Sequence, residues 1–113
     1  MDVSLTAGAV EIDWRGWPEG ITEAVLQGAV ALRAAKPKSH VTLVVANPPV
    51  NSAQRQCLRE ALRGLIHSSV LERPDIRSNL AFGGMSEDRQ RIIAYLDRAT
   101  FVFGATIDLG NPS

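Results

Sequence analysis

Three arginines, Arg55, Arg59 and Arg63, recur every fourth residue near the middle of the chain. Residues four apart lie on one face of an α-helix, so these guanidinium groups would form a stripe of positive charge. Such a stripe is either a solvated helix face or a contact for an anion or a protein partner. Guanidinium groups bind oxyanions through paired N–H···O bonds. Arg55 and Arg59 are therefore candidate anion-binding residues.

The other chemically active residue types do not combine into a site. Cys57 is the one cysteine in the sequence, and it falls among apolar residues of helical spacing, as a small buried hydrophobe would. His40 and His67 stand apart, and no group of residues has metal-ligand spacing. The sequence contains neither the G-x-G-x-x-G pattern nor a P-loop, the two turns that commonly bind phosphate groups. We therefore expect no catalytic residue, metal or cofactor.

Length and charge narrow the class of protein. The 113 residues suit one domain, residues 1–113, and 12 basic residues balance 12 acidic ones. A neutral chain lacks the electrostatic attraction to nucleic acid or to an anionic membrane. The N-terminus has no basic start followed by an apolar run, and no segment is apolar enough to span a bilayer. We therefore expect a cytoplasmic protein that binds neither nucleic acid nor membrane.

The apolar pattern alternates between strand and helix periods. The run Val41–Ala46 is short, β-branched and apolar throughout, which is typical of a parallel strand buried on both faces. Alternating strands and helices favour a parallel sheet with crossover helices. We predict an α/β, Rossmann-like fragment of two or three layers, with four parallel strands in the order 1-2-3-4 and three helices. The predicted elements are strands 10–14, 41–46, 76–82 and 100–109, a turn over 15–20, a helix over 21–36, a helix from Asn51 or Ser52 to Val70, and a helix capped by Ser86.

Three stretches of the chain resemble the C-terminal half of the short-chain dehydrogenase/reductase family. They are ALRGL (61–65) within a predicted helix, DIRSN (75–79) at the third strand and FVFGATID (101–108) at the last strand. The resemblance covers roughly residues 21–110. It implies that the last helix lies on the opposite face of the sheet from the other two, although right-handed crossovers would put all three on one face.

The chain departs from the family at every catalytic position. The family's Gly-rich cofactor turn belongs to an N-terminal half that this sequence lacks. Alignment on ALRGL places Arg55 and Arg59 at the catalytic tyrosine and lysine, and a protonated guanidinium cannot replace an acid–base tyrosine. The catalytic serine has no clear counterpart near residues 47–49, where Ser52 is the nearest candidate. The family's Pro-Gly pair is only half matched by Gly83-Gly84. The resemblance therefore implies a pseudoenzyme.

In the family, the counterparts of the first two predicted helices form the dimer interface. We therefore expect a non-catalytic interaction protein, which is either a homodimer or a structural or regulatory subunit of a full-length short-chain dehydrogenase. The alternative is a small-molecule binding protein in which Arg55 and Arg59 meet an anion in the crevice at the strand C-termini. The predicted interface residues are Gly28, Leu32, Leu58, Ala61, Leu62 and Leu65.

Overall fold

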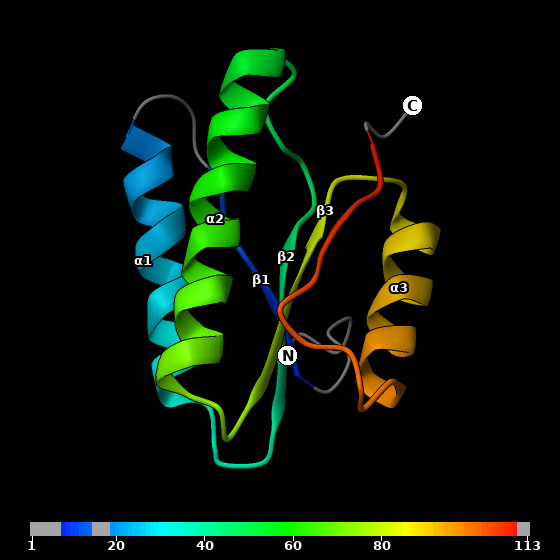
Figure 1. Cartoon of the computed structure of the whole chain (residues 1–113). Helices are drawn as coiled ribbons and strands as arrows, with labels where there is room; N and C mark the ends of the chain where they lie inside the picture. The colour runs from blue at the N-terminus through cyan, green and yellow to red at the C-terminus, as the bar shows by residue number, and fades with distance from the viewer. Residues whose placement is uncertain (1–7, 15–18, 111–113) are drawn as a thin grey trace.

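The structure is a computed structural model that describes residues 8–14 and 19–110. Strands and helices alternate along the chain, as predicted (Figure 1). The elements are β1 (Ala9–Glu11), α1 (Glu19–Ala34), β2 (His40–Val45), α2 (Ser52–Glu72), β3 (Arg77–Phe82), α3 (Ser86–Arg98) and β4 (Thr106–Asp108).

The four strands form one parallel sheet in the order β1-β2-β3-β4, which confirms the predicted fold class and strand order. The central strands β2 and β3 pair over six residues, from His40 opposite Arg77 to Val45 opposite Phe82. The edge strands β1 and β4 pair over three residues each. Every residue of β2 is buried, as a strand covered on both faces requires.

Helices cover both faces of the sheet. The helices α1 and α2 pack on one face and α3 on the other, which gives three layers (Figure 1). The larger core lies under α1 and α2 and includes Leu43, Leu62 and Phe82, whereas Val44 and Ile93 belong to a smaller core on the α3 face.

The strand order and the position of α3 fix the hand of the last crossover. Each strand pairs with the next in sequence and all run in one direction, so a helix on the opposite face makes a connection of opposite hand. The crossovers through α1 and α2 are right-handed, and β3–α3–β4 is left-handed (Figure 1). Parallel crossovers are right-handed in about 98% of cases. The resemblance gave the correct side for α3, and the general rule did not.

Several element boundaries differ from the predictions. The last strand is three residues long because the chain turns at Ala99–Val102 and again at Gly104, whose φ of 72° suits glycine. The N-cap of α3 is Met85 and not Ser86, and its side chain makes no capping hydrogen bond. Of the predicted turn over 15–20, residues 15–18 lie outside the described residues, and Glu19 already begins α1.

Two arginines anchor the C-terminal ends of helices. The Arg77 guanidinium donates to the backbone carbonyls of Leu96, Asp97 and Ala99 at the end of α3, at 3.0 to 3.1 Å. Arg73 donates in the same way to three carbonyls at the end of α1. Terminal carbonyls have no partner within their own helix, so these cations satisfy them and offset the negative end of the helix dipole. Within the described part of the chain, no helix is long and apolar enough to cross a membrane.

Candidate functional site

The arginine stripe begins in the first turns of α2. The Asn51 side chain accepts a hydrogen bond from the Gln54 amide at 3.0 Å and fixes where the helix starts. Because α-helical residues four apart are offset by about 40°, the stripe winds outward along the helix. The exposed fraction of the side chain accordingly rises from 12% at Arg55 to 28% at Arg59 and 49% at Arg63.

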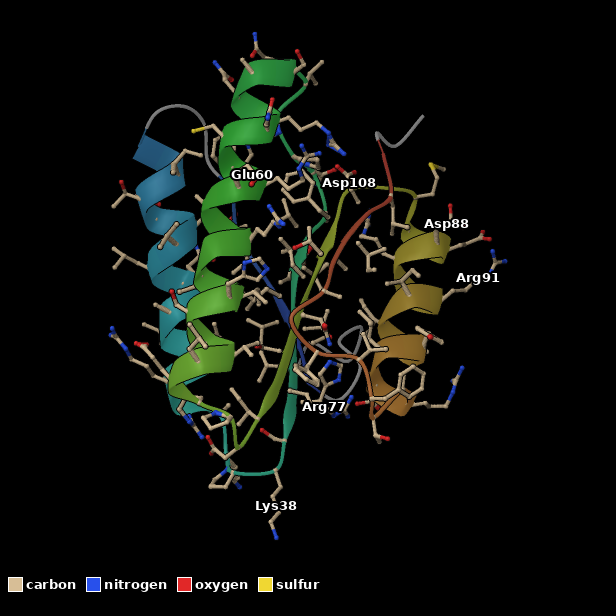
Figure 2. The ribbon with its side chains drawn as sticks, viewed as in Figure 1. Lys38, Glu60, Arg77, Asp88, Arg91 and Asp108 are labelled. Atoms are coloured by element: carbon tan, nitrogen blue, oxygen red, sulfur yellow. The ribbon has the colours of Figure 1, made fainter. Side chains whose placement is uncertain are left out.

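Asp108, the last residue of β4, receives both of the inner guanidinium groups. Arg55 Nη2 donates to Asp108 Oδ1 at 2.6 Å, and Arg59 Nη1 donates to the other carboxylate oxygen. The backbone amide of Gly110 also donates to Oδ1, at 2.9 Å. Burial disfavours the charged carboxylate, but the bonds from Gly110, Arg59 and Arg55 more than offset it and hold the pKa of Asp108 below its usual value. Figure 2 shows Asp108 at the upper end of β4, beside α2.

Arg55 contacts Phe82 at the end of β3 in addition to its ion pair with Asp108. Its guanidinium carbon lies 4.9 Å from the centre of the Phe82 ring, a cation–π distance. Its Nη1 atom is buried and has no hydrogen-bond partner among the described residues. A Cβ at Gly83 would lie 3.1 Å from Arg55 Nη2 and 2.3 Å from the Gly110 carbonyl oxygen, so only glycine fits there. Gly83 therefore lets Gly110, just after β4, and the Arg55 guanidinium approach the end of β3 closely.

The structure brings Arg55 and Arg59 together at Asp108, whereas Arg63 pairs with Glu60 on the same helix, and Glu60 Oε2 also lies 3.7 Å from Arg59 Nε. Sequence reasoning missed Asp108, although the resemblance ran as far as this residue. The pair lies at the C-terminal ends of β3 and β4, beside Phe82 and Asp108, within the strand-end region where the anion contact was predicted. A cleft of about 470 Å³ lies at the C-terminal ends of β1 and β2, and it carries the carboxylates of Glu11 and Asp13. The arginine pair belongs instead to the β3–β4 side of the sheet.

Most of the predicted interface residues lie inside the chain's own core. Leu58 and Leu62 are fully buried, Leu32 is almost so, and Gly28 is buried where α1 meets Leu65 of α2 and the sheet. These residues have no surface to offer a second chain. Of the six, Ala61 and Leu65 are partly exposed. An interface on these two helices would need other exposed residues in addition to Ala61 and Leu65.

The outer faces of α1 and α2 supply such residues. Leu26 and Val30 lie one turn apart on α1 and are 59% and 63% exposed. On α2, Cys57 and Gly64 are exposed, and a Cβ at Gly64 would meet no described atom within 4 Å. Cys57 is therefore not the buried hydrophobe that its neighbours suggested.

A second polar cluster is buried between the sheet and α3. The Asn79 Oδ1 atom accepts from the Ala105 amide, so its Nδ2 faces His40 Nε2, at 3.1 Å, and donates to it. Thr42 Oγ1 also lies 3.0 Å from Nε2. His40 is thus neutral, with its proton on Nδ1, 3.6 Å from the Asp97 carboxylate. Burial, the largest cause, lowers the pKa of His40. Thr42 and Asn79 are almost completely enclosed, so this cluster is structural.

Within the described residues, no group of three or more His, Cys, Asp or Glu side chains can hold a metal ion. No protein-family model matches the chain, and no curated protein or solved structure matches it either.

Proposed function

We propose that this chain is a non-catalytic interaction protein that associates through the outer faces of α1 and α2. Its partner is a second copy of itself or a full-length short-chain dehydrogenase, in which case it acts as a structural or regulatory subunit. The observation that carries the proposal is the exposed apolar pair Leu26 and Val30 beside a helix that presents Cys57 and Gly64.

The position of Leu26 and Val30 on their helix supports this proposal. The buried residues Ala24, Gly28 and Leu32 mark the side of α1 that faces the core. At 100° per residue, Leu26 and Val30 point away from that side. A single exposed leucine is ordinary on a protein surface, but two aliphatic side chains on adjacent turns make an apolar strip that association would bury.

The neighbouring helix supports it in a different way. Cys57, Ala61, Gly64 and Ser68 follow each other at spacings of four, three and four residues, so they share one side of α2. Their small side chains allow the backbone of another helix to come close. Glu60, four residues before Gly64, lies at the edge of this side, and Arg63 points away from it.

The absence of catalysis is the second half of the proposal. Arginine stands at the two positions where the resemblance implies an acid–base tyrosine and lysine. In this chain both of these arginines, Arg55 and Arg59, are bonded to Asp108. A guanidinium remains protonated and cannot act as an acid–base group near neutral pH.

The test is the mass in solution, measured by light scattering on a sizing column over a range of concentrations. We expect twice the 12.2 kDa of one chain for the homodimer. Leu26→Glu places a charge within the apolar strip and should give a monomer. Gly64→Leu fills open space without disturbing the fold and should also give a monomer, because it prevents close helix approach.

The matched control is Phe101→Glu, which changes a side chain that is 76% exposed outside α1 and α2. It should leave the dimer intact. If Phe101→Glu dissociates the dimer and Leu26→Glu does not, the interface lies outside α1 and α2. A monomer at all concentrations that also fails to bind an added full-length short-chain dehydrogenase would refute the proposal.

A further inference from the structure

We propose that Arg55 and Arg59 form an oxyanion site that Asp108 occupies in the free chain, and that a small phosphomonoester dianion exchanges with Asp108 there. The site lies on the side of α2 that faces β4, whereas Leu26 and Val30 lie on the outer side of α1. It therefore does not depend on the association proposed above.

The geometry of the bound carboxylate defines the ligand chemistry. Arg55 and Arg59 each donate to a different oxygen of Asp108, so two helical turns present their donors as a two-pronged clamp. A guanidinium clamp of this kind suits a carboxylate or a phosphoryl group. Both oxygens of the present occupant come from the chain itself.

The charge balance favours a dianion over the occupant. Three guanidinium groups, those of Arg55, Arg59 and Arg63, share two carboxylates, because Glu60 pairs with Arg63 and also lies 3.7 Å from Arg59, and one positive charge is therefore left in excess. The buried Nη1 of Arg55 also has no hydrogen-bond partner among the described residues, so the clamp has unused donor capacity. A phosphomonoester carries close to two negative charges above its second pKa of about 6 and offers three acceptor oxygens. In place of the Asp108 carboxylate, and together with Glu60, a dianion balances the three guanidinium groups, which a single carboxylate does not.

The site is open enough for exchange. The side chains of Arg59 and Asp108 each expose 28% of their surface, so the carboxylate can leave toward solvent while Arg55 stays against Phe82. Asp108 belongs to the short edge strand β4, which is held by fewer ladder bonds than β2 and β3.

Exchange has a structural consequence that can be observed. The Gly110 amide donates to Asp108 Oδ1, and the Gly110 carbonyl accepts from the Gly84 amide at 2.7 Å. When the carboxylate leaves the clamp, the end of β4 loses its side-chain contacts with α2 and is held only by its backbone bonds to Phe82 and Gly84. The amide signals of Gly84 and Gly110 should therefore both report the exchange.

The experiment is a titration of the full chain followed by ¹H–¹⁵N NMR at about pH 8. The probes are phenyl phosphate, benzenesulfonate and benzoate, which share one ring and differ in charge and shape. Benzenesulfonate has the tetrahedral shape of the phosphate ester with a single charge. We expect phenyl phosphate to bind most tightly and to shift the amides of Gly84 and Gly110.

Asp108→Asn tests the occupancy directly, because it keeps the shape of the side chain and removes its charge. A binding-competent state that is populated at about 0.1–10% lowers the apparent affinity by roughly 10- to 1,000-fold. Removing the competing charge should therefore tighten phenyl phosphate binding by about tenfold or more. Arg59→Gln should weaken it in both backgrounds. Arg63→Gln is the matched control, since Arg63 lies on the same stripe but pairs with Glu60, and it should change binding by less than about twofold.

Three results would overturn the proposal. The first is no saturable shift in the folded Asp108→Asn variant. The second is binding that Arg59→Gln and Arg63→Gln weaken equally, which would indicate diffuse attraction to the helix surface. The third is binding to the unaltered chain without any shift of Gly84 and Gly110, which would place the ligand beside Asp108 and not in exchange with it. If Asp108→Asn does not fold, the comparison of the three probes on the unaltered chain and on Arg59→Gln decides the question.

Discussion

Two glycines in helix interiors should respond in opposite ways to the same substitution. Gly28 lies in α1 and Gly64 in α2, each more than one turn from the helix ends. Replacing glycine by alanine in a helix interior stabilises the helix by about 0.5–1 kcal/mol, because glycine loses more conformational freedom on folding. This gain is common to both positions, so a comparison of the two variants removes it.

The surroundings of the two glycines differ. A Cβ at Gly28 would lie 2.7 Å from Leu65 Cδ2 and 3.0 Å from Leu43 Cδ1, whereas a Cβ at Gly64 would meet no described atom within 4 Å. Leu43 is fully buried and has little room to move. Forcing an extra methyl group into a packed core costs about 1–3 kcal/mol. Gly64→Ala should therefore be more stable than Gly28→Ala by about 1–3 kcal/mol.

Urea unfolding followed by circular dichroism measures this difference. Both variants should be measured at one low protein concentration, so that association does not contribute. In thermal unfolding, a difference of 1 kcal/mol corresponds to roughly 4 °C in Tm. If the free energies of unfolding of the two variants agree within about 0.3 kcal/mol, the close approach of α1 to Leu65 and Leu43 at Gly28 is refuted.

Three further predictions concern buried or paired charges. Because His40 is kept neutral, its folded pKa lies below the unfolded value of about 6.5, so the free energy of unfolding should rise with pH between these two values and level off above them. Urea unfolding at several pH values should show this slope, and an equal slope in His40→Asn would contradict the assignment. Asp108 gives a dependence of the same sign at lower pH: its stabilisation is present above the unfolded pKa of about 3.9 and is lost as the pH falls through the lower folded value. Acid titration of Asp108→Asn should lack this component, and a curve identical to that of the unaltered chain would be evidence against the ion pairs. Arg77→Met leaves three carbonyls at the end of α3 without their donor and should destabilise the chain by about 2–4 kcal/mol in urea unfolding. The control is Arg98→Met, because Arg98 is an exposed arginine in the last turn of the same helix. It should change the free energy of unfolding by less than about 0.5 kcal/mol. Equal effects of the two substitutions would show that the bonds from Arg77 do not stabilise the end of α3.

The sequence was sufficient to predict the sheet, because its signals are local. The apolar run Val41–Ala46 indicates a strand with both faces covered, and it forms β2. The order of the strands follows from the regular alternation of elements. The side on which α3 packs was not predictable from periodicity, because an amphipathic helix such as Ser86–Arg98 can cover either face of a sheet.

The candidate sites were less predictable, and for two different reasons. The apolar stripe that contains Leu58 and Leu62 shows that one side of α2 is buried, but periodicity does not distinguish burial in the chain's own core from burial against a partner. These residues therefore seemed suited to an interface. The site at Asp108 depends on contacts across 49 and 53 residues, to Arg59 and Arg55. No local pattern reveals a contact at that separation.

The agreement between strand order and chain order has a consequence for how this protein folds. Each pairing of strands joins neighbouring units, so no strand waits for a distant part of the chain before it can pair. Short sequence separation between contacting elements lowers the entropy lost on closing each loop and speeds folding. The sheet can grow one strand–helix unit at a time from the β2–β3 pair. We expect the left-handed β3–α3–β4 unit to form last in folding, because α3 packs on the face of the sheet that α1 and α2 leave open.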